Sequence, residues 1–165
     1  MAPRSYSVFI SSVLTLMLFA AITWFSCSKD KCNSTYCENG GGCYKGNCIC
    51  SPGFEGTTCA TNWRQKFFGN WQQTPLAGTI PAEQFAISIG NGATYSDVKI
   101  INFDNYFTLP VSGYMSSSDS LIIPSQVLEG VTVSGVAYYK SANNILVNYT
   151  TTSATGVIKT VSATW

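Results

Sequence analysis

Residues 32–59 read CNSTYCENGGGCYKGNCICSPGFEGTTC, and this stretch decides how the N-terminal part of the chain folds. Its six cysteines, together with Cys27 just before it, are all the cysteines of the sequence. Six cysteines at such short spacings predict three disulfides, although the spacing alone leaves fifteen pairings open. A piece of this size cannot bury enough apolar surface to fold unaided, so we expect disulfides to hold it together.

The second half of this stretch carries a specific motif. Cys48 and Cys50 are followed by the Gly53-Phe54 pair, a second glycine and the final Cys59. This arrangement resembles an epidermal-growth-factor-like (EGF-like) module, and residues 32–59 are identified as such a module. The resemblance implies three disulfide pairs, namely Cys32–Cys43, Cys37–Cys48 and Cys50–Cys59.

Calcium-binding EGF-like modules carry acidic and amide residues before the first cysteine and an Asp or Asn shortly after the third. Here Asp30 stands alone before Cys32, and Tyr44 and Lys45 follow Cys43. A hard cation prefers six to eight oxygen ligands, which this arrangement does not assemble. We therefore predict no metal site in the module.

The N-terminus has the pattern of a targeting segment. Residues 8–25 contain no charged residue and follow a single basic residue, Arg4, which together predict a signal helix. Ser26-Cys27 then resembles the end of a bacterial lipoprotein lipobox, in which the cysteine becomes acylated. We predict a signal peptide at 1–26 and a lipidated tether at 27–31, attached through Cys27. A plain cleaved signal and an uncleaved anchor are the alternatives, because an apolar helix of this length would also span a bilayer core.

Lipidation of Cys27 also accounts for the odd cysteine, because it consumes one thiol and leaves an even set. The disulfides then require an oxidising compartment outside the cytosol. No tether residue matches the Asp that retains bacterial lipoproteins at the inner membrane. We expect an exported protein at the bacterial outer membrane or cell surface, with the membrane as its partner through the N-terminal lipid.

From Lys66 onward the character of the sequence changes. After a linker at residues 60–65, residues 66–165 lack cysteine and place β-branched and aromatic residues in short runs separated by turn formers. These runs predict eight strands joined by hairpins, hence an all-β chain with an antiparallel up-and-down barrel or sandwich. The predicted strands are Lys66–Gln73, Glu83–Ile89, Asp97–Phe103, Tyr106–Met115, Ser120–Ile123, Val131–Lys140, Ile145–Thr151 and Val157–Trp165.

The inward face of these strands follows from their alternation of apolar residues. Phe85, Ile87 and Ile89 share one face, whereas the alternation slips at Ile100-Ile101 and around Gly135. A slip of one residue exchanges the two faces of a strand, so we predict β-bulges at both places.

Two further stretches of the β domain carry resemblances. Gly69-Asn70-Trp71 on the first predicted strand resembles the Gly-x-Trp of the calycins, the group that includes lipocalins and avidins. That resemblance implies an eight-stranded barrel, wide enough inside for side chains or one small ligand. Residues 122–126 and 131–135 also look like the β domains that follow EGF-like modules in bacterial surface lipoproteins.

Composition argues against most catalytic chemistry. The chain has no histidine, which removes the commonest general base and the commonest metal ligand. Nine basic residues nearly balance eight acidic ones, so there is no electrostatic footprint for nucleic acid. Asp97 and Asp104 do not mark a carboxylate pair, and we expect both at the solvated ends of strands. We predict no catalytic residue, metal or cofactor.

Three hypotheses on function follow. The favoured one is a non-catalytic, lipid-anchored surface protein whose EGF-like module presents the β domain to a protein or glycan for binding or adhesion. The second is a carrier that holds a small apolar ligand inside the barrel. The third is a hydrolase with an unrecognised site. An interior filled by large side chains favours the first hypothesis over the second.

Overall fold

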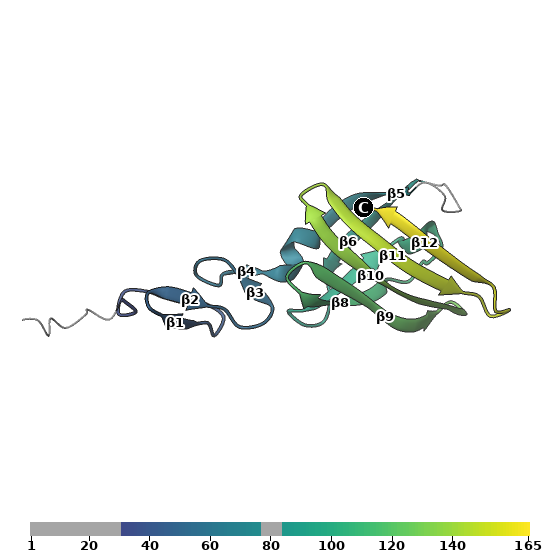
Figure 1. The fold of residues 1–165 in the computed structure, drawn as a ribbon. Coiled ribbons are helices and arrows are strands. Elements are labelled where there is room, and N and C mark those ends of the chain that lie inside the picture. Colours follow the sequence, from purple (N-terminus) through teal and green to yellow (C-terminus); the bar gives the residue numbers. More distant parts are fainter. Residues whose placement is uncertain (1–30, 77–83) are drawn as a thin grey trace, which may run out of the picture.

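The computed structural model describes residues 31–76 and 84–165. The predicted signal peptide, the lipid attachment at Cys27 and the first residue of the second predicted strand, Glu83, lie outside the described residues. The described chain is all-β and consists of a small disulfide-bonded module followed by a closed eight-stranded barrel. Figure 1 shows the module extending from one end of the barrel.

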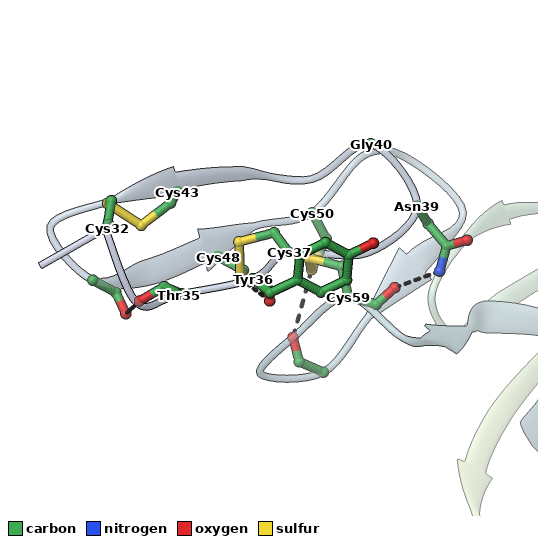
Figure 2. The surroundings of a disulfide bond; sticks show 12 residues. Cys32, Thr35, Tyr36, Cys37, Asn39, Gly40, Cys43, Cys48, Cys50 and Cys59 are labelled. Carbon is green, nitrogen blue, oxygen red and sulfur yellow. Dashed lines mark hydrogen bonds between the residues drawn. A yellow bond between two sulfur atoms is a disulfide. The ribbon is translucent and has the colours of Figure 1, made fainter.

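Residues 32–59, the disulfide module, are cross-linked by Cys32–Cys43, Cys37–Cys48 and Cys50–Cys59. These are the pairs that the EGF-like resemblance implies. Figure 2 shows the three disulfides following one another along the module, with Cys50–Cys59 nearest the barrel. Asn39 reinforces this end, because its side-chain amide donates to the carbonyl of Cys59 at 2.8 Å.

The strands of this region are short, because disulfides rather than an extended sheet hold it. A hairpin turn at Lys45-Gly46 has φ angles of 51° and 87°, the left-handed conformation that two-residue hairpin turns require. The four strands form two antiparallel pairs, β1 (Gly42–Tyr44) with β2 (Asn47–Ile49) and β3 (Phe54–Glu55) with β4 (Thr61–Asn62).

The barrel is an up-and-down meander, in which each strand pairs with its neighbours in sequence and the last strand closes on the first. All eight predicted strands are present, which confirms the predicted architecture and selects the barrel over the sandwich. The strands are β5 (Gly69–Pro75), β6 (Phe85–Asn91), β7 (Asp97–Ile101), β8 (Val111–Ser117), β9 (Ser120–Leu128), β10 (Val131–Ser141), β11 (Asn144–Thr152) and β12 (Ile158–Thr164).

Two short 3₁₀ helices replace ends of predicted strands. The first strand begins at Gly69 rather than Lys66, because η1 (Trp63–Phe67) precedes it and delivers the fully buried Phe67 to the core. The third strand ends at Ile101, and η2 (Phe103–Asn105) follows it. The next strand therefore starts at Val111 instead of Tyr106.

The predicted bulge at Ile100-Ile101 is wrong. Both residues pair regularly with β6, and the apolar Ile101 lies on the outer face with half of its surface exposed. The register does shift near Gly135, but the extra residue lies on the partner strand β9, at Pro124-Ser125. A proline within a strand has no N–H to donate, which explains why the pairing breaks there.

Large side chains fill the barrel interior. Inward residues of β6 to β12 and of the two 3₁₀ helices form one buried cluster, which includes Phe67, Phe103 and Trp165, and Trp71 of β5 packs against it. Phe103 packs edge-on against Tyr149 and Trp165, with ring centroids 4.6 Å and 6.0 Å away. Such a layer of interlocking rings is a packed core rather than an open calyx.

The disulfide module and the barrel share a continuous set of contacts. The predicted linker, residues 60–65, forms β4 and the start of η1. Tyr95, in the β6–β7 turn, stacks on Phe54 of the module with ring centroids 5.5 Å apart. Lys66 bridges both parts, because its ammonium lies 3.0 Å from Glu55 of the module and 2.9 Å from Asp119 in the β8–β9 turn.

Charge and hydrogen bonding strengthen this bridge at Lys66. Partial burial opposes the charge of Lys66, but the hydrogen bonds and charges of Asp119 and Glu55 outweigh it and raise the lysine pKa. The hydrogen bond from Lys66 in turn lowers the pKa of Asp119. Because Asp119 is mostly exposed, this bridge orients the two parts more than it stabilises them.

Candidate binding site

A cavity of about 350 Å³ opens at the barrel end opposite the disulfide module. Hairpin turns β6–β7 and β8–β9 face the module, so the other end is formed by η2, the start of β10, the end of β11 and the start of β12. We call this end the distal mouth; in Figure 1 the β11–β12 turn marks it. The cavity is lined by Phe85, Asp104, Asn105, Tyr106, Phe107, Val131, Thr151, Ser153, Val157 and Lys159.

Asp104 reaches this cavity through an unusual backbone turn. Asn102, Asp104 and Asn105 have φ angles of 58°, 56° and 49°, in the left-handed region. Asn and Asp enter this region more readily than other non-glycine residues, which explains why this turn is rich in them. The side-chain amide of Asn102 also donates to the carbonyl of Ala86 at 2.8 Å and ties the turn to β6.

Glu129 fixes the segment that follows this turn. One of its carboxylate oxygens accepts hydrogen bonds from the backbone N–H groups of Thr108 and Leu109, both at 2.9 Å, and from the Thr108 hydroxyl. These bonds, that of the Thr108 hydroxyl first, lower the pKa of Glu129. The chain that carries Tyr106 and Phe107 to the mouth is thereby held against the β9–β10 turn.

A chain of hydrogen bonds runs from the cavity into the core. Lys159 Nζ lies 2.7 Å and 2.8 Å from the two carboxylate oxygens of Asp104, whose side chain is only 8% exposed. The Tyr149 hydroxyl donates to Asp104 at 2.5 Å and accepts from the Gln73 amide at 3.0 Å. The Gln73 oxygen accepts from the Trp165 indole at 2.8 Å. Every buried member of this chain is therefore partnered.

The network keeps the floor of the cavity free of net charge. Burial, followed by the hydrogen bond to Asp104 and its charge, raises the pKa of Tyr149, so the phenol is protonated at neutral pH. The remaining charges are the carboxylate of Asp104 and the ammonium of Lys159, which compensate each other.

Thr151 adds a hydroxyl group beside this ion pair. It lies directly opposite Lys159 across the β11–β12 ladder and is 7% exposed. Its side chain makes no hydrogen bond to any residue in 31–76 or 84–165, in contrast to Gln73, the other buried polar residue found there. Thr151 therefore presents to the cavity a hydroxyl that has no partner in the described part of the chain.

The sequence predicted the strands that carry Thr151 and Lys159, but it did not predict that these residues form a site with Asp104. We expected Asp104 at the solvated end of a strand, and this prediction is wrong. Asp104 instead forms a nearly buried ion pair with Lys159. Lys159 and Thr151 continue the apolar faces of their strands, since Lys159 lies two residues before the buried Val161 and Thr151 lies two residues after the buried Tyr149. A polar or charged residue at an inward-facing position of a strand is the sequence feature that could have indicated a polar site inside the barrel. We did not predict a polar site from this feature.

Trp71, the residue behind the calycin resemblance, lies at the other end of the barrel. Its indole donates to the carbonyl of Phe67 at 2.8 Å and packs against the core beneath η1. The closed eight-stranded barrel is compatible with a calycin-like barrel, and Trp71 serves it by closing the end next to the module.

Two features are absent from the described ranges. No helix in residues 31–76 and 84–165 is long and apolar enough to cross a membrane. The same ranges hold no group of three or more His, Cys, Asp or Glu side chains placed to bind a metal ion.

The three disulfides indicate an extracellular or exported protein, because such bonds persist in oxidising compartments. Comparison with models of protein families and with curated protein sequences finds nothing that matches this chain.

Proposed function

We propose that this chain is an exported, lipid-anchored, non-catalytic binding protein that presents the distal mouth of its barrel away from the membrane. The observation that carries this proposal is the position of the cavity at the barrel end opposite the disulfide module. The anchor predicted at Cys27 precedes the module in the chain, and the module precedes the barrel. The distal mouth is therefore the end of the barrel farthest from the predicted anchor.

The contacts between the disulfide module and the barrel support a spacer role. A flexible tether would leave the barrel free to lie on the lipid surface. Here the stacking of Tyr95 on Phe54, the bridge at Lys66 and the hydrogen bond from Asn62 to the Tyr95 carbonyl at 2.8 Å fix the barrel on the module. The mouth therefore keeps one direction relative to the module.

The packed interior argues for recognition at the mouth over carriage inside the barrel. A carrier of an apolar ligand needs open volume among its inward side chains. The inward residues here include Phe103, Tyr149 and Trp165, which are buried, and the Phe103 ring packs against both of the others. A ligand can enter the mouth without displacing this layer.

Membrane fractionation of the full chain in a Gram-negative host tests the anchoring. We expect wild-type protein in the membrane fraction and the Cys27→Ser variant released from it, because serine cannot accept the thioether-linked lipid. Ser28→Ala, one position on, is the matched control and should stay with the membrane. If Cys27→Ser remained fully membrane-bound after a carbonate wash, the lipid anchor would be wrong.

A further inference from the structure

We propose that the distal mouth binds a small uncharged molecule with several hydroxyl groups, of about the size of a single sugar ring. Thr151, Lys159 and Asp104 supply its hydrogen bonds, and the apolar rim packs against its carbon skeleton. This inference rests on the proposed function and adds the chemical class of the ligand.

The balance of charge in the mouth selects an uncharged ligand. Asp104 and Lys159 are the two charged residues among those lining the cavity, and they pair with each other. An anion bound at Lys159 would place a second negative charge beside the nearly buried Asp104, and a cation bound at Asp104 would face Lys159. Breaking a partly buried ion pair leaves one charge uncompensated, which is costly. An uncharged ligand leaves the pair intact.

The hydrogen-bonding groups at the inner wall favour hydroxyl groups in particular. An ammonium such as Lys159 can only donate, and a carboxylate such as Asp104 can only accept. A ligand hydroxyl does both, so neighbouring hydroxyls on one small skeleton can engage both residues.

Thr151 provides the observation that points most directly to a ligand. The residue is 7% exposed and lines the cavity, and its hydroxyl has no partner among the described residues, whereas Gln73, Tyr149 and Asp104 of the adjoining network are paired with one another. Because this hydroxyl opens to the cavity and can both donate and accept, it can bind a ligand hydroxyl without giving up a hydrogen bond to the described residues.

The size and the walls of the cavity fit the same class of ligand. At about 30 Å³ for each water-sized group, 350 Å³ holds on the order of a dozen non-hydrogen atoms, as in one hexose. Phe85, Tyr106 and Val131 line its sides. Apolar and aromatic walls around a few polar groups are the usual composition of a small-molecule site, and the C–H face of a sugar ring can pack on them.

Saturation-transfer NMR on the full chain, reconstituted in lipid nanodiscs with empty nanodiscs as the blank, tests the ligand class. The probes are methyl glycosides of neutral hexoses, the charged analogues glucuronate and glucosamine, and octanoate as an apolar chain. We expect transfer to the neutral glycosides, weaker transfer to both charged sugars and none to octanoate. Binding of octanoate or a charged sugar in place of the neutral glycosides would overturn the ligand class but leave a binding protein.

Substitution of Thr151 by the isosteric valine tests the residue assignment. Thr151→Val should weaken the affinity for the neutral glycoside by about five- to tenfold, the size of one hydrogen bond. Thr150→Val, the neighbour on the outer face of β11, is the matched control and should bind as wild type does. Equal affinity in Thr151→Val would overturn the assignment, and no binding of any probe would count against both the ligand class and the proposed mouth site.

Discussion

At the scale of single residues, Asp104 shows how local backbone and distant side chains cooperate. Its left-handed φ of 56° turns the carboxylate inward, where Lys159 and Tyr149 bind it. A non-glycine residue in this conformation is mildly strained, and strain of this kind persists only where surrounding contacts hold it. The ion pair and the phenol supply those contacts, so the mouth is preformed before any ligand arrives.

The hydroxyl of Tyr149 should contribute measurably to this arrangement. Tyr149→Phe leaves the Gln73 amide with a missing acceptor and Asp104 with one donor fewer, and we expect a loss of about 1–3 kcal/mol in the free energy of unfolding near neutral pH. Urea denaturation followed by tryptophan fluorescence measures this loss. Tyr138→Phe, on the outer face of β10, is the matched control.

The same variant should reveal the raised pKa of Tyr149. The folded state favours the protonated phenol, so its contribution to stability is fully present below the unfolded pKa of about 10 and declines as the pH rises beyond it. The stability gap between wild type and Tyr149→Phe should therefore be nearly constant between about pH 8 and about pH 9 and smaller at about pH 10.5. A gap that stayed constant or widened would contradict the pKa shift.

At the scale of elements, the contact between β10 and β11 depends on one missing side chain. Gly135 faces Tyr149 across the ladder, and a Cβ there would lie 2.6 Å from both the Asn148 carbonyl oxygen and the Tyr149 Cβ. Glycine thus lets Tyr149 sit close to its neighbouring strand and reach Asp104. The residue at position 135 of β10 must therefore be glycine, because β11 leaves no room for a side chain there.

Gly135→Ala should therefore destabilise the barrel by roughly 1–3 kcal/mol, because the strands must separate to admit the methyl group. Gly90→Ala on β6 is the control, since a Cβ at that position meets nothing within 4 Å. We expect the control to be neutral or slightly stabilising, because alanine lowers the entropy of the unfolded chain. Equal midpoints of chemical denaturation for the two variants would refute the close approach at Gly135.

At the scale of the whole molecule, the disulfide module and the barrel should move as one body. Tyr95 carries much of this coupling, since its ring covers Gly53 and stacks on Phe54. The remaining contacts at Lys66 are partly exposed and therefore weak individually. Orientation of the mouth then depends on this aromatic contact and on the hydrogen bond from Asn62 to the Tyr95 carbonyl more than on the ion pairs.

Tyr95→Ala should leave both parts folded and uncouple their motions. Backbone ¹⁵N relaxation measures this directly: in the wild type, both parts should tumble with one rotational correlation time, and in Tyr95→Ala the module should tumble faster than the barrel. Tyr44→Ala, an exposed tyrosine on β1 of the module, is the matched control. Separate correlation times already in the wild type would contradict the rigid spacer.

Much of the architecture was present in the sequence alone. The cysteine spacing predicted three disulfides, and its resemblance to EGF-like modules implied the pairs that form. Alternation of apolar residues predicted eight strands and their order, because burial on one face of a strand leaves a period of two in any sequence. Both signals are local, so neither requires knowledge of what lies across the barrel.

The site was decided only by the tertiary structure. Gln73 meets Trp165, 92 positions away, because closure of the barrel brings β12 beside β5. Asp104 in η2 meets Lys159 of β12, 55 positions away, at the distal mouth. Alternation says which residues point inward, but not which of them meet, since that depends on strand register and on bulges such as the one at Pro124. The left-handed turn at Asp104 and the inward hydroxyl of Thr151 come together in one site only when the barrel closes.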